Sequence, residues 1–107
     1  MGQETFTKVD DNHAVSSTGF EVKWSSRDAI TYIEHPRHIE LYLEGYWDNK
    51  GEWQHEIVVP SEPKWRPPHH AEPLSWNHLT SIKTNLIHAL RFLYPGVPFE
   101  FRDDFNR

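Results

Sequence analysis

Residues 75–93 read SWNHLTSIKTNLIHALRFL, and this stretch decides the fold. At the helical period of about 3.6 residues, its large aliphatic side chains fall on one stripe and polar side chains cover the other side. Ser75 can cap the first turn, because its hydroxyl can accept a hydrogen bond from a free backbone amide. Pro95-Gly96 ends the pattern. The stretch therefore predicts one amphipathic helix, whose buried stripe consists of Leu79, Ile82, Leu86, Ala89, Leu90 and Leu93.

The segments on either side of this helix have the pattern of strands. Apolar and polar residues alternate over residues 20–24, 37–47, 52–59 and 97–102, and residues 28–34 are rich in β-branched side chains. Short turns join antiparallel strands, and a single helix can cover one face of such a sheet. We predict an α+β fold: an antiparallel sheet of about five strands in the order β-β-β-β-α-β, with the helix on one face.

The composition indicates one folded domain. A chain of 107 residues with 36% hydrophobic and 14% aromatic residues can bury a single core. Residues 1–18 are mostly polar, so we predict an N-terminal arm there and a single α+β domain over residues 19–107. The chain has no cysteine, which excludes disulfides and thiolate chemistry and favours a reducing compartment. With no apolar run of membrane-spanning length and no signal peptide at the start, we predict a cytoplasmic protein.

The charge is negative and uneven along the chain. The net charge is −5, and residues 1–62 carry 12 acidic residues against 5 Lys and Arg. Nucleic-acid binding depends on clustered Lys and Arg, so direct contact with nucleic acid is disfavoured. The same electrostatics favour a basic protein partner.

The strand over residues 37–47 places His38, Glu40, Tyr42 and Glu44 on one face by its alternation. These groups could perform acid–base chemistry or hold a metal, but no catalytic motif accompanies them. A partner-binding face needs only exposure, acidity and aromatic groups. We therefore predict no catalytic residues, metal or cofactor, and a partner-binding surface formed by Glu40, Tyr42, Glu44, Tyr46, Trp47, Asp48, Glu52, Glu56 and Trp65.

Trp65 stands in a proline-rich loop over residues 60–73. A tryptophan in such a loop can anchor a partner, because Trp is enriched in interface hot spots. More often, such a tryptophan packs on the domain and fixes the loop. An adaptor domain that binds through this loop is thus an alternative, beside a small enzyme that uses His38, Glu40 and Glu44.

The C-terminal part of the chain resembles a known family. The run Trp65-x-Pro67-Pro68, then Leu74-Ser75, then Ile82-x-x-Asn85-x-Ile87-x-Ala89-Leu90 is similar to bacterial immunity protein family seventy-four, with strands 30–33 and 39–43 in the corresponding order. The resemblance covers roughly residues 28–100. Such proteins belong to polymorphic-toxin and contact-dependent growth-inhibition systems.

The resemblance implies a small, non-enzymatic, cytoplasmic protein. Each member binds one cognate toxin domain, often a nuclease, and covers its active site or substrate surface. We therefore expect a basic, nuclease-type toxin as the partner, with no membrane involved. A homodimer through the open sheet face stays an alternative.

Overall fold

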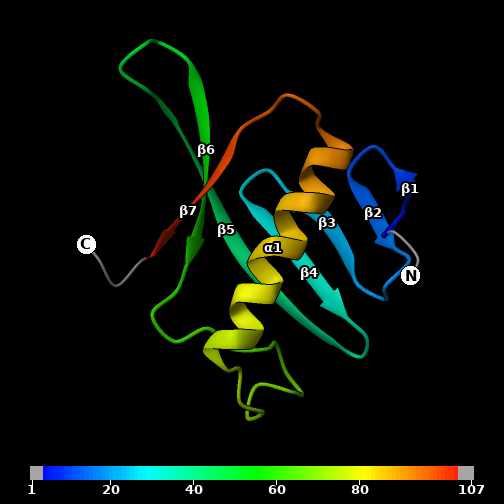
Figure 1. Ribbon diagram of the computed structural model, residues 1–107. Helices are drawn as coiled ribbons and strands as arrows, with labels where there is room; N and C mark the ends of the chain where they lie inside the picture. The colour runs from blue at the N-terminus through cyan, green and yellow to red at the C-terminus, as the bar shows by residue number, and fades with distance from the viewer. Residues whose placement is uncertain (1–3, 104–107) are drawn as a thin grey trace.

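The structure is a computed structural model that describes residues 4–103. Its elements follow in chain order as β1 (Phe6–Asp10), β2 (His13–Ser16), β3 (Glu21–Ser26), β4 (Ala29–Glu34), β5 (Arg37–Trp47), β6 (Trp53–Val59), α1 (Trp76–Leu93) and β7 (Phe99–Asp103). All seven strands form one sheet in sequential order, and α1 lies across it (Figure 1). Each of β1 to β5 is antiparallel to the strand that follows it, whereas β7 is parallel to β6.

The prediction of an antiparallel sheet of about five strands in the order β-β-β-β-α-β is wrong: the sheet is mixed and has seven strands. Both additional strands come from the segment predicted as a polar arm. β1 and β2 pair antiparallel, and β2 pairs with β3. These two strands contain few buried apolar residues. β1 lies at the edge of the sheet and contributes mainly Phe6 to the interior. Their alternation is therefore faint in the sequence.

The last strand is parallel because of the connection that precedes it. The chain leaves β6, passes through the proline-rich loop and α1, and returns beside β6 in the same direction. A parallel pair requires such a long crossover, whereas the earlier strands are joined by short turns. The register aligns His55 with Phe99 and Val59 with Asp103.

The helix agrees with its prediction. The Ser75 hydroxyl accepts a hydrogen bond from the backbone N–H of His78 at 3.1 Å, and all six residues of the predicted stripe are buried. Burial of a large aliphatic side chain contributes about 1.5–3 kcal/mol, so this stripe is a major part of the core. Beyond the helix, Gly96 has a φ of +84°, a conformation that favours glycine.

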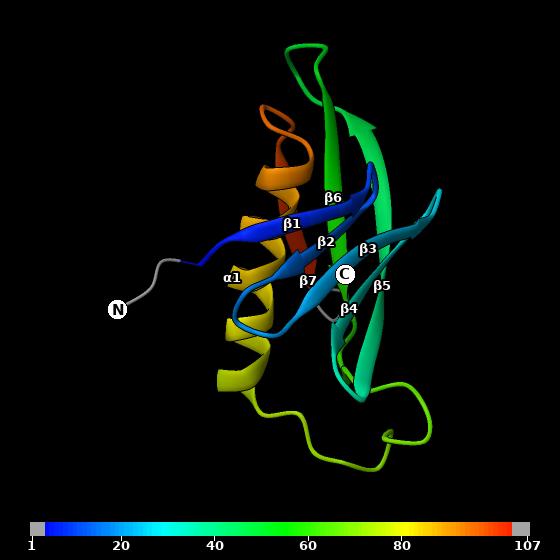
Figure 2. The same ribbon diagram turned by 90° about the vertical axis from the view of Figure 1, so that its right-hand side faces the viewer.

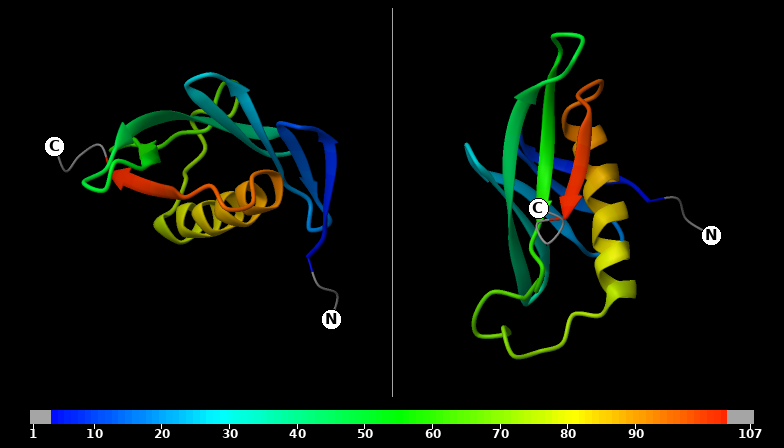
Figure 3. Two further views of the ribbon diagram at one scale, coloured as in Figure 1. Left: turned by 90° about the horizontal axis from the view of Figure 1, so that it is seen from above. Right: turned by 90° about the vertical axis from the view of Figure 1, so that its left-hand side faces the viewer.

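The sheet curves, and α1 lies on its concave side (Figures 2 and 3). The inward side chains of the central strands, among them Ile30, Tyr32, Leu41 and Ile57, meet the helix there. The buried Tyr32 hydroxyl donates to Glu34 at 2.6 Å and accepts from the Asn85 side chain at 2.9 Å. Within residues 4–103, the convex face of the sheet has no helix on it (Figure 3). The burial pattern of β5 alternates, so its exposed residues Glu40, Tyr42 and Glu44 point to that face.

Candidate protein-binding surface

The outer face of β5 carries the predicted acidic side chains. Ile39, Leu41 and Leu43 point inward and are buried, so the residues between them point outward. Glu40 and Glu44 are exposed there, and 67% of Tyr42 is accessible to solvent. The alternation predicted this side of the strand correctly.

Three carboxylates lie side by side across the outer face. Glu44 on β5 is directly opposite Glu56 on β6, and Glu56 is aligned with Glu100 on β7. We call these three residues the acidic row. Like charges in direct cross-strand contact repel, so the row needs a cation or a partner.

Arg102 on β7 supplies the cation within the molecule. One guanidinium nitrogen lies 2.8 Å from a Glu44 oxygen, and another lies 3.2 Å from a Glu56 oxygen. The Glu56 side chain is 18% exposed, so its carboxylate is held beneath the surface. The Tyr46 hydroxyl donates to the third member, Glu100, at 3.3 Å. Partial desolvation and then the Glu100 charge raise the pKa of Tyr46, which keeps this phenol protonated.

The turn between β5 and β6 is fixed by Asp48. One oxygen of its carboxylate accepts from the backbone N–H groups of Lys50 and Glu52, both at 2.9 Å, and the other accepts from the Gln54 side chain. The backbone N–H of Glu52, followed by that of Lys50, lowers the pKa of Asp48. Predicted as a contact residue, Asp48 is thus engaged in holding the turn, while Glu52 is exposed beside it.

Two tryptophans lie together on the other face of this hairpin. Trp47 and Trp53 are opposite each other in the register, with ring centroids 5.0 Å apart and ring planes at 72°. They are 69% and 45% exposed, respectively. Trp53 was not part of the predicted surface. The two tryptophans lie close to the two ends of the predicted turn at residues 48–51, and a hairpin around that turn would have brought Trp53 near Trp47. Exposed aromatic residues of this size are typical of interaction sites.

Trp65 does not belong to this surface. Its side chain is 2% exposed and lies in the core, where its ring meets His78 with centroids 5.4 Å apart. The backbone N–H of the next residue, Arg66, donates to the His38 carbonyl at 2.8 Å. A buried indole cannot anchor a partner, so Trp65 does not form part of the contact surface for which it was predicted. Its position agrees with the alternative in which it fixes the loop.

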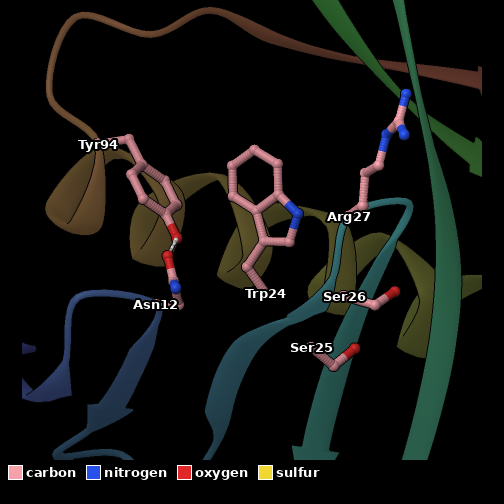
Figure 4. A pocket seen from close by; sticks show the side chains of 6 residues that line it. All are labelled: Asn12, Trp24, Ser25, Ser26, Arg27 and Tyr94. Atoms are coloured by element: carbon pink, nitrogen blue, oxygen red, sulfur yellow. Dashed lines mark hydrogen bonds between the residues drawn. The ribbon is translucent and has the colours of Figure 1, made fainter.

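A second aromatic cluster lies on the inner side, near the end of α1. The Trp24 ring meets Tyr94, His55 and Phe99, with centroids 5.0, 5.6 and 6.0 Å away. A hollow of about 520 Å³ borders Trp24. In the wall of this hollow the Tyr94 hydroxyl donates a hydrogen bond of 2.7 Å to the Asn12 side chain (Figure 4). Burial lowers the pKa of His55, which favours the neutral imidazole.

Metal-ligating side chains do not converge among residues 4–103: the structure holds no group of three His, Asp or Glu there that could bind an ion. His38, Glu40 and Glu44 lie along one strand, spaced by its rise of about 3.3 Å per residue. His69 instead contacts Glu72 at 2.5 Å, and Glu72 also binds Arg37. Helix α1 falls short of what a helix needs to cross a membrane, within the part of the chain that the structure describes.

Comparison of the chain with protein-family models, with characterised proteins and with solved structures found no match.

Proposed function

We propose that this chain is an immunity protein, which binds and neutralises a cognate bacterial toxin domain in the cytoplasm without catalysing a reaction. The resemblance of residues 28–100 to such proteins supports the proposal, as does the net charge of −5. The observation that carries it is the outer sheet face, where the acidic row, Glu40 and the exposed Tyr42 lie over neighbouring strands.

The partner is a basic toxin of the nuclease type. A nuclease binds phosphates through clustered Lys and Arg, and a surface of carboxylates can occupy the same cationic site. The outer face of β5 to β7 carries one arginine, Arg102, and four glutamates: Glu40, Glu44, Glu56 and Glu100. Charge complementarity of this kind speeds association and selects against wrong partners. The toxin would lose access to its substrate while the complex lasts.

Binding to the purified toxin domain encoded directly upstream, measured by calorimetry, tests this function. The double variant Glu40→Lys, Glu100→Lys should bind about 10-fold more weakly, since exposed charge pairs contribute up to about 1 kcal/mol each. The control is Glu62→Lys, which makes one such charge reversal at an exposed position in the proline-rich loop. These positions are chosen because Glu44 and Glu56 are tied to Arg102, and their reversal would also alter the fold.

The loss should be concentrated in the association rate and should shrink at high salt, because solvent-exposed charges are screened. Absence of a complex with the upstream toxin would overturn the function itself. A complex unaffected by the double variant would leave the function standing and reject the acidic face as its surface.

A further inference from the structure

The hairpin between β5 and β6 projects beyond the rest of the sheet. Figures 1 and 2 show the end of β5 and the start of β6 extending past the loop that follows α1. We call residues 44–56 the projecting hairpin. It carries 4 acidic residues against 1 Lys, so its charge is strongly negative for its length.

The two faces of the projecting hairpin differ in chemistry. The exposed pair Trp47 and Trp53 covers the inner face, beyond the reach of the helix. The outer face presents Tyr46 and the two β5–β6 members of the acidic row. A flat partner placed on the outer face would leave both indoles in water, which is unusual for the largest apolar groups of a small domain.

The backbone of the hairpin is held before any partner arrives. The three hydrogen bonds accepted by the Asp48 carboxylate close the turn, and Gly51 takes a φ of +78° within it. Gly45 has no side chain, and a Cβ there would lie 2.0 Å from Trp53 Cζ2, so the indole lies directly over the strand. A preformed binding element loses little conformational entropy on association.

From these features we infer that the projecting hairpin inserts into a cationic cleft of the partner protein, which contacts both of its faces. The Trp47–Trp53 pair is the apolar anchor against one wall, and the carboxylates of the outer face meet basic side chains on the other. The inference rests on the proposed function and specifies the shape of the toxin surface: a cleft with a positive wall, such as one that admits a nucleic-acid strand.

Alanine variants on the two faces test the insertion, with the purified upstream toxin domain as the probe. Trp47→Ala on the inner face should weaken binding about 30-fold or more, as expected for a central tryptophan anchor. Trp76→Ala is the matched control, because this tryptophan is 65% exposed at the start of α1, far from the hairpin. Both variants should keep the melting temperature of the parent, which separates loss of contact from loss of fold.

A bulky label at the turn supplies a second measurement. The chain has no cysteine, so Lys50→Cys can be labelled alone with a large maleimide, and labelled Lys64→Cys is the control in the proline-rich loop. Insertion predicts that the label at position 50 abolishes binding and that the label at position 64 does not.

Two outcomes would overturn the inference. In the first, Trp47→Ala and the label at position 50 leave the affinity unchanged, while the double variant Glu40→Lys, Glu100→Lys weakens binding. The proposed function would then hold, but the toxin would bind to the outer sheet face alone. In the second, sedimentation shows a homodimer that Trp47→Ala dissociates, because the Trp47–Trp53 pair would then serve self-association.

Discussion

At the scale of single residues, Arg102 resolves a conflict that the strand register creates. The register places the Glu44 and Glu56 carboxylates opposite each other, and the guanidinium lies within 3.2 Å of both. We expect Arg102→Met to lower the free energy of unfolding by about 1 kcal/mol, since these groups are partly solvent-exposed and screened. Urea denaturation at low salt measures the loss.

The same loss should become smaller when the repulsion between Glu44 and Glu56 is removed, although the ion pair between Arg102 and Glu56 remains. In a Glu44→Gln background, Arg102→Met should cost much less, and high salt should reduce its cost in the parent. Arg27→Met is the control, because that arginine is almost fully exposed and lies 3.9 Å from Asp28. Equal costs in both backgrounds would show that Arg102 acts by packing rather than by charge.

Gly45 makes a second residue-scale contribution, through the space that it leaves for Trp53. Gly45→Ala should cost about 1 kcal/mol, the lower end for overpacking, because the partly exposed indole can swing outward. The displaced ring should also weaken the exciton signal of the Trp47–Trp53 pair in circular dichroism. In a Trp53→Ala background the substitution should be nearly neutral, and a persistent cost there would contradict the argument.

At the scale of elements, the sequence was sufficient wherever the pattern is local. The stripe from Leu79 to Leu93 predicted α1 to within one residue, and alternation predicted β5 and the side on which Glu40 and Tyr42 lie. Both patterns follow from the geometry of a single helix or strand. No knowledge of the neighbouring elements is required.

Pairing between distant elements was not predictable in the same way. Alternation in Phe99–Asp103 is the same whether that strand runs parallel or antiparallel to its neighbour, so the mixed sheet was missed. Arg102 and Glu100 were missed with it, because only the β6–β7 register brings them to Glu56. Trp65 was assigned to the surface because the prolines around it predict a loop, and they do not indicate whether the side chain of Trp65 packs on the core.

The buried position of Trp65 allows a prediction for the proline-rich loop. Trp65→Ala should lower the free energy of unfolding by about 3–5 kcal/mol, the usual cost of removing a buried tryptophan. Thermal and urea denaturation measure it, with the exposed Trp76→Ala expected to cost much less than Trp65→Ala. A normal melting temperature for Trp65→Ala combined with lost partner binding would restore the adaptor alternative.

At the scale of the whole molecule, glutamates paired with histidine or arginine connect segments that are distant in the chain. Glu21 on β3 contacts both His13 on β2 and His35 in the turn after β4. Glu72 in the proline-rich loop binds Arg37 on β5. Two further pairs reach the helix, from His78 to Glu34 at 2.9 Å and from His88 to Glu4 at 3.4 Å. Protonation of these glutamates should therefore loosen the molecule as a whole.

The pH dependence of stability follows from two of these glutamates. Hydrogen bonds from His35 and His13 lower the pKa of Glu21, and Arg37 followed by His69 lowers that of Glu72, in each case below the ordinary value of 4.5. A carboxylate whose folded pKa lies below its unfolded pKa stabilises the fold above the unfolded value, and this contribution is lost as pH falls through the folded pKa. The free energy of unfolding, measured by urea titration, should thus decrease as the pH is lowered below about 4.5.

A variant of Glu21 tests the contribution of this carboxylate. Glu21→Gln should be less stable than the parent at pH 7 and should approach the stability of the parent at low pH. The control Glu62→Gln, at an exposed position, should have the stability of the parent at every pH. Parallel curves for Glu21→Gln and the parent would show that the two histidines do not stabilise this carboxylate.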